Sequence, residues 1–136
     1  MIRRFISLLP KTPRRMEDSP REYDREYETP VSHYARKRLG YNRAQTEITR
    51  FVVQLEYKHE DEWHSVVRYD HDVESEFGHD VSKDGVHIDI YREDEKYRTE
   101  YVAPPMPAKR ALDRAEDHLS NNLVGFIRRF EEWHEI

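Results

Sequence analysis

Residues 50–70 read RFVVQLEYKHEDEWHSVVRYD, and this stretch decides the fold. In its first half, apolar side chains alternate with polar ones, which is the period of a strand with one buried face. A polar turn, KHEDE, separates it from a second run with the same period. Two alternating runs joined by a short polar turn are typical of a β-hairpin. The residues expected on its buried face are Phe51, Val53, Leu55, Tyr57, Trp63, Val67 and Tyr69.

A second hairpin and a helix follow. VHIDIYRE places Val86, Ile88 and Ile90 on one face, and a turn at EDEK leads into YRTEYV, where Tyr97 and Tyr101 share a side. After three prolines, apolar residues recur at steps of three and four, from Leu112 through Phe126 and Phe130 to Trp133, as on one face of a helix. Strands are therefore predicted near 50–58, 62–70, 86–93 and 96–102, with a helix over 107–134. The predicted fold class is α+β: a four-stranded antiparallel sheet with one long C-terminal helix packed on one face.

The first 46 residues differ in composition from the rest. Residues 10–30 combine prolines and charges with almost no aliphatic side chains, so an extended chain is expected there. Ser32 is suited to capping a short helix over 32–40. Residues 1–50 hold 12 basic and 7 acidic residues, a charge of +5, whereas residues 51–136 hold 11 and 21, a charge of −10. The predicted organisation is a basic, extended N-terminal arm over 1–46 and an acidic α+β domain over 47–136.

Composition excludes several classes of protein. The chain of 136 residues has no Cys, which rules out disulfides, thiolate metal ligands and a Cys nucleophile. No apolar run approaches the roughly 20 residues that span a bilayer, and the short apolar start lacks a cleavage site for secretion. A cytoplasmic protein that does not contact membranes is expected. Four Gly in total exclude a Gly-rich phosphate-binding loop.

One loop concentrates histidine and aspartate. His71, His79 and His87 are spaced by eight residues, and the 15-residue connection from His71 to Gly85 is long for an antiparallel link. Matching the apolar faces of the two strands brings their polar faces together as well. Arg68, Asp70, His87 and Asp89 are therefore expected on the face away from the helix, and His71 or His79 can fold back over them.

Three interpretations of this group stay open. Imidazole beside carboxylate supports acid–base chemistry near neutral pH, with Arg68 or Tyr91 stabilising an anionic transition state, as metal-independent RNA cleavage requires. His and Asp are also ligands for divalent metals, although the spacings match no named metal motif and neither metal nor cofactor is assigned. The third interpretation is a solvated sheet face on which Arg68 and Asp89 form a cross-strand pair.

The segment from Phe51 to Arg92 resembles an uncharacterised small-domain family of halophilic archaea. The resemblance rests on VQLEY, WHSVVRYDH, GHD and VHIDIYR. More distantly it is similar to TumE-type toxins of toxin–antitoxin pairs, in which a strand ending in Asp leads through a His-rich loop to another strand. That resemblance implies correspondence at Asp70, His79 and His87.

Two functions are consistent with these features. The first is a non-catalytic interaction module, or a small subunit of a larger assembly, that docks on a protein partner through its basic arm, with RNA as the other candidate partner. The alternative is an enzyme, a TumE-like RNA-cleaving toxin whose catalytic residues are Arg68, Asp70, His79, His87 and Asp89. The residues expected to contact the partner are the tyrosines and cations of the arm: Tyr23, Tyr27, Tyr34, Arg36, Lys37, Arg38, Tyr41 and Arg43.

Overall fold

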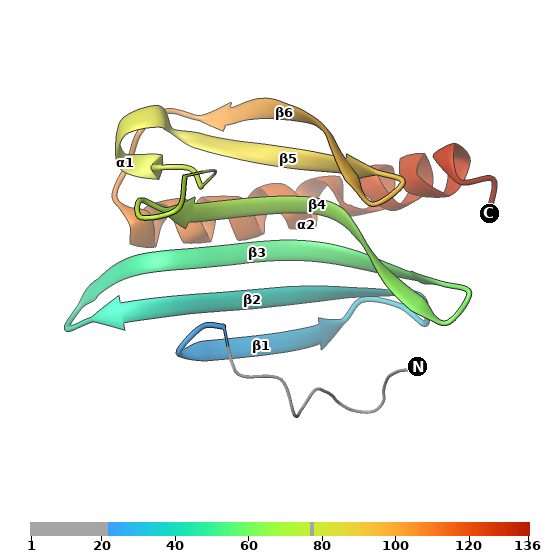
Figure 1. Ribbon diagram of the computed structural model, residues 1–136, viewed down its shortest axis with the longest axis horizontal. Helices are drawn as coiled ribbons and strands as arrows, with labels where there is room; N and C mark the ends of the chain where they lie inside the picture. Colours follow the sequence, from blue (N-terminus) through green and yellow to red (C-terminus); the bar gives the residue numbers. More distant parts are fainter. Residues whose placement is uncertain (1–21, 77) are drawn as a thin grey trace.

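Six antiparallel strands lie in one sheet in the order in which they follow along the chain (Figure 1). The computed structural model describes residues 22–76 and 78–136. A long helix, α2, crosses one face of the sheet and packs on its central strands β3, β4 and β5. The elements are β1 (Arg25–Pro30), β2 (Ala35–Ala44), β3 (Glu47–His59), β4 (Glu62–Asp72), α1 (Val81–Asp84), β5 (Val86–Arg92), β6 (Glu95–Ala103) and α2 (Ala108–Trp133).

The α+β class is confirmed, but the four-stranded sheet is wrong, because residues 25–30 and 35–44 add two strands to it. The extended arm is therefore sheet in this part, and a strand replaces the short helix predicted over 32–40. Ser32 does bind a backbone N–H, but it accepts from Tyr34, 3.1 Å away, and closes the turn between β1 and β2. β2 pairs with β3 along its whole length. Pairing with a central strand outweighs the helix preference of a short Arg- and Lys-rich segment.

The expected boundary after residue 46 lies in the tight turn between β2 and β3. Part of β2 also contributes to the core: Ala35 is buried, and Leu39 and Tyr41 pack against the buried cluster. Lys37, on the same face, forms an ion pair with Glu116 of α2 at 3.1 Å. The apolar alternation of β2 is thus interrupted by a cation that has a partner on the helix.

The core lies between β3–β5 and α2, as the alternation predicts. Of the residues expected on the core side, Trp63 and Phe126 are only half-buried. Burial is confirmed for Phe51, Val53, Leu55, Tyr57, Val67, Tyr69, Ile88, Ile90, Leu119 and Phe130. Among the described residues, no helix has the length and apolarity needed to cross a membrane.

Two β-bulges change which face some side chains occupy. A register shift opposite Leu55 and Glu56 makes Val66 an extra residue of β4. Trp63 was expected on the helix side, but the bulge moves it to the opposite face, where the Arg36 guanidinium lies 3.9 Å from its ring centroid. A one-residue insertion reverses every side chain beyond it.

A second shift, in β6, separates Tyr97 from Tyr101, which were expected on one side. Tyr97 meets Trp133 of α2, whereas Tyr101 lies edge-on to His87 on the opposite face.

Candidate functional site

The face of the sheet opposite α2 carries a row of charged and polar side chains, which we call the polar face. Its members come from five neighbouring strands, because in each strand every second residue points away from the helix. Hydrogen bonds and ion pairs connect many of them from strand to strand. The members that matter here are Arg36, Arg38, Gln54, Glu56, Arg68, Asp70, His87, Asp89, Tyr91 and Thr99.

On the β2 side, Glu56 is the centre of the network. Its carboxylate is buried and receives Arg36 Nε at 2.7 Å, Gln54 Nε2 at 2.6 Å and Arg38 Nη1 at 3.5 Å. Burial alone opposes ionisation of this group, but the charges of Arg36 and Arg38 hold its pKa below the ordinary value. Glu56 is therefore a fixed anion whose partners are all side chains of this sheet.

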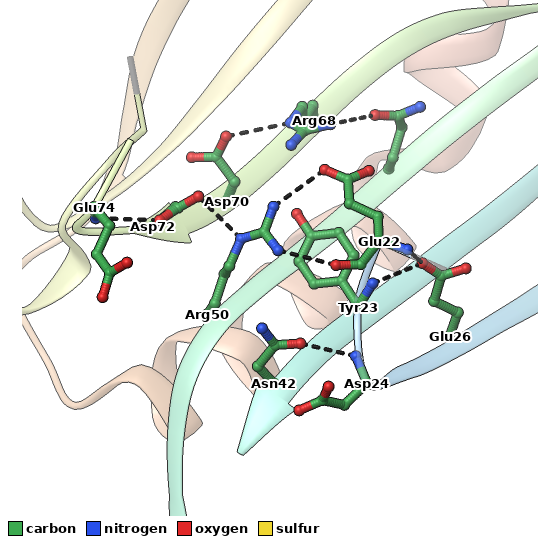
Figure 2. Close-up of polar contacts among 11 residues, drawn as sticks. Glu22, Tyr23, Asp24, Glu26, Asn42, Arg50, Arg68, Asp70, Asp72 and Glu74 are labelled. Carbon is green, nitrogen blue, oxygen red and sulfur yellow. Dashed lines mark hydrogen bonds and ion pairs between the residues drawn. The ribbon is translucent and has the colours of Figure 1, made fainter. Parts of the chain in front are cut away.

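In the middle of the face, Arg68 joins two strands (Figure 2). Its Nη1 donates to Gln54 Oε1 at 3.1 Å, and its Nε donates to Asp70 Oδ2 at 3.2 Å. Across the β4–β5 ladder, Arg68 lies directly opposite Asp89. The cation thus stands between the network on β3 and the acidic residues of β4 and β5.

The loop after β4 returns over the polar face and delivers His79. The His79 N–H donates to Asp70 Oδ1 at 3.2 Å, and its carbonyl accepts from the Asp72 N–H at 2.8 Å. Gly78 makes this return path feasible, because a Cβ there would lie 2.5 Å from the Asp72 carbonyl oxygen. The side chain of His79 is consequently held above β5.

His79 and Asp89 form an imidazole–carboxylate pair on this face. His79 Nε2 lies 3.2 Å from Asp89 Oδ1, which also accepts from Thr99 Oγ1 at 2.7 Å, and Lys96 Nζ lies 3.4 Å from Asp89 Oδ2. The Asp89 side chain is only 2% exposed. Burial raises its pKa, but the hydrogen bonds from His79 and Thr99 outweigh burial and lower the pKa to about 2. The same hydrogen bond to Asp89 raises the pKa of His79 above its ordinary value.

A second imidazole lies directly beside the first. The rings of His79 and His87 are stacked, with centroids 5.3 Å apart and planes 13° apart, and Tyr101 lies edge-on to His87 at 5.8 Å. His87 Nδ1 is buried and has no hydrogen-bond partner among the described residues. We call His79, His87, Asp89, Lys96 and Thr99 the His–Asp cluster.

The structure gathers the five residues predicted as catalytic, Arg68, Asp70, His79, His87 and Asp89, on the polar face. His71 does not join them. It is buried beside Phe51, and its Nδ1 accepts the Val81 N–H at 3.1 Å. Burial lowers the pKa of His71, so the neutral ring that this hydrogen bond needs is favoured.

The sequence interpretation missed the contribution of β6. Lys96 and Thr99 both reach Asp89 from this neighbouring strand, and Tyr101 covers His87. The register of the β5–β6 hairpin would identify Thr99, which pairs with Asp89. Within residues 22–76 and 78–136, no three His, Asp or Glu side chains are arranged to hold a metal ion.

The residues predicted to contact a partner are mostly engaged within the chain. Tyr23 is buried and Arg36, Lys37 and Arg38 have acidic partners. Tyr41 stacks with Tyr27, and Tyr34 stacks with Tyr57. Those that remain largely exposed are Tyr27, Tyr34 and Arg43.

The chain belongs to a family of domains of unknown function, DUF7718, whose model matches residues 19–136. The match begins before β1, so the family domain includes the two strands that the sequence assigned to an arm. Membership of an uncharacterised domain family, which the segment from Phe51 to Arg92 indicated, is confirmed. Searches of the curated proteins and of the solved structures find no match to this chain.

Proposed function

We propose that the protein cleaves RNA with the His–Asp cluster as its catalytic site. The observation that carries this proposal is the pair of stacked imidazoles, one of them bonded to a buried carboxylate, on a face that also presents Arg68 and Lys96. Two imidazoles with different surroundings can act as an acid and a base in one reaction. The cations supply positive charge where a phosphate would bind.

Cleavage of RNA by its own 2′-hydroxyl needs both roles. A base removes the 2′-hydroxyl proton, the oxygen attacks the adjacent phosphorus, and the bond to the 5′-oxygen breaks as an acid protonates that oxygen. The products are a 2′,3′-cyclic phosphate and a free 5′-hydroxyl, with no oxidant, reductant or water consumed. The negative charge that develops on the phosphate oxygens is stabilised by nearby cations.

We assign the catalytic roles from the surroundings of each residue. Asp89 favours the protonated form of His79, so His79 is the general acid, acting through Nδ1 because Nε2 is bonded to Asp89. His87 has no carboxylate partner in the cluster and is the general base. Arg68 and Lys96 are the cations that face the phosphate. Asp70 is a positioning residue, because it holds the His79 backbone and Arg68.

The resemblance of residues 51–92 to TumE-type toxins supports the same activity. In that setting the protein is a haloarchaeal toxin that acts on RNA in the cytoplasm and is neutralised by an antitoxin protein. Of the three residues that correspond to the toxin pattern, His79 and His87 belong to the His–Asp cluster, and Asp70 positions the His79 backbone.

Purified protein tests the proposal directly. It should cleave single-stranded RNA to 2′,3′-cyclic phosphate ends, and His79→Ala or His87→Ala should each lower the rate by about 100-fold or more, the usual contribution of acid–base catalysis. His59→Ala is the matched control, because His59 lies at the end of β3, away from the His–Asp cluster. Equal rates in all three variants would indicate a contaminating nuclease and overturn the proposal.

Cleavage should also depend on pH in a defined direction. The acid must carry a proton, so the rate should fall as the pH rises through the raised pKa of His79. Asp89→Asn removes the charge that raises this pKa and should move the alkaline decline to lower pH. An unchanged decline would exclude His79 as the acid.

A second candidate function is the interaction module. It is favoured by two exposed tyrosines: Tyr27, on the edge strand β1, is 54% exposed, and Tyr34, in the turn that follows β1, is 60% exposed. Exposed aromatic side chains are frequent anchors of protein interfaces. A partner that co-purifies in stoichiometric amount from the native host should be lost with the double variant Tyr27→Ala/Tyr34→Ala. Tyr97→Ala, on the opposite edge strand, is the control. Retention of the partner by the double variant would exclude this surface.

A further inference from the structure

A pocket of about 290 Å³ opens on the polar face beside the His–Asp cluster. Tyr23, Gly40 and Val52 contribute uncharged lining surface on and beside β2 and β3. Arg68 lines the pocket and also lies opposite Asp89 in the β4–β5 ladder, so the pocket and the cluster adjoin. Ligand pockets begin at roughly 300 Å³, and this one has room for a single base or nucleoside.

The polar groups of the pocket include a carboxylate in a fixed position. Glu26 Oε2 accepts two backbone N–H groups, those of Glu22 and Tyr23, each at 3.0 Å (Figure 2). These bonds orient the carboxylate through one oxygen and leave Oε1 for other donors. Arg38 and Arg68 line the same pocket and add guanidinium donors.

The mixture of charges selects the kind of ligand. Three acidic residues, Glu22, Glu26 and Glu28, line the same pocket as the two arginines, so a bare anion would be repelled by part of the lining. A heterocycle with hydrogen-bond donors on one edge and acceptors on another suits both the carboxylates and the guanidinium groups. Among the four RNA bases, only guanine offers two adjacent donors, N1–H and N2–H₂, to a carboxylate, and its O6 and N7 are the acceptors that Arg prefers.

We propose that this pocket binds a guanine base of the RNA strand, with Glu26 Oε1, the oxygen not bonded to the backbone, accepting from N1–H and N2–H₂ and an arginine donating to O6 or N7. The inference rests on the proposed function for its substrate class. β3 and β5 are two strand spacings apart, roughly 10 Å. A nucleotide whose base lies over β2 and β3 can therefore extend its phosphate past Arg68 to the His–Asp cluster.

Binding of mononucleotides to the full chain tests the pocket without cleavage. By calorimetry or NMR titration, guanosine monophosphate should bind about tenfold more tightly than adenosine, cytidine or uridine monophosphate, which lies at the lower end of the discrimination that specific base contacts give. Guanosine, which lacks the phosphate, should still bind more tightly than the other three nucleosides. Inorganic phosphate, which lacks the base, should not reproduce the tighter binding of guanosine monophosphate. Equal affinity for the four nucleotides, or no binding of any of them, would overturn the inference.

Glu26→Gln is the decisive variant. Its amide oxygen can still accept the two backbone N–H groups, whereas its NH₂ meets the guanine donors with a donor. The guanine preference should disappear, while Asp113→Asn, on the exposed side of α2, should keep it. Val52→Phe fills the pocket from within β3 and should abolish binding of all four nucleotides. A guanine preference that survives both pocket variants would refute the assignment.

The two proposals can fail separately. His59→Ala should leave guanosine monophosphate binding unchanged, because His59 neither lines the pocket nor belongs to the His–Asp cluster. Selective binding by a protein that cleaves no RNA would retain the pocket and reject the catalytic function. RNA cleavage by a protein that shows no base preference, either in cleavage or in nucleotide binding, would reject the guanine pocket and retain the catalytic function.

Discussion

Replacing Gly40 by alanine should destabilise the protein only while Tyr23 is present. A Cβ at Gly40 would lie 2.8 Å from two carbons of the Tyr23 ring, closer than real Cβ atoms approach. Gly40 lies within β2, where alanine can adopt the same backbone. The cost therefore arises from the ring, which is only 5% exposed and has the Arg50 guanidinium 4.1 Å from its centroid.

The magnitude follows from the two ways in which the chain can respond. If the ring shifts slightly, the overpacking cost is about 1–3 kcal/mol. If the ring leaves, the chain loses the burial of one aromatic side chain, about 1.5–3 kcal/mol, together with about 0.5–1 kcal/mol from the Arg50 cation–π contact. Gly40→Ala should therefore lower the free energy of unfolding by about 1–3 kcal/mol. In a Tyr23→Ala background the clash is absent, and Gly40→Ala should instead stabilise the strand by about 0.5–1 kcal/mol.

Urea unfolding of the wild type, both single variants and the double variant measures this reversal of sign. The double-mutant cycle should give a coupling free energy of about 2 kcal/mol or more, at an unchanged dependence on urea concentration. The same cost of Gly40→Ala in both backgrounds would show that Tyr23 does not pack on Gly40 in solution.

Three further outcomes are expected. Burial lowers the pKa of His71, so the stability that its neutral ring provides is present above about pH 6.5 and is lost as the pH falls through the folded-state pKa. His79, whose pKa is raised, contributes in the opposite direction. In urea unfolding between pH 5 and 8, His71→Gln should therefore reduce the loss of stability at the acidic end. Glu60 and Asp61 have φ values of 54° and 65° in the β3–β4 turn, a backbone region that Asn and Gly adopt more readily. The double variant Glu60→Asn/Asp61→Gly should therefore raise the free energy of unfolding, measured in urea, by about 1 kcal/mol. A fragment of residues 47–136 keeps nearly all of the core, so circular dichroism should show that it folds alone. Because the edge of β3 is then uncovered, the fragment should self-associate in analytical ultracentrifugation. An unfolded fragment would show that β1 and β2 are required for folding.

The alternation of apolar residues was sufficient to predict the four strands and the helix that enclose the core. Phe51, Val53 and Leu55 can be buried together only if residues 50–58 form a strand with one face on α2. The same period placed Arg68, Asp70, His87 and Asp89 on the opposite face. Phe126 continues the helix stripe but is only half-buried, whereas Phe130, one turn later in α2, is buried.

Only the tertiary structure decided the remainder. β1 and β2 lack a continuous apolar face, and they become strands because β3 offers an unsatisfied edge and Lys37 finds Glu116 on α2. The bulges that move Trp63 and separate Tyr97 from Tyr101 each depend on one extra residue, which is selected by pairing between strands and is not indicated by any local pattern. The position of His79 above Asp89 likewise depends on the path of a loop, set by contacts between residues nine and ten apart. Sequence periodicity thus determined which side chains leave the core, and long-range pairing determined which of them meet.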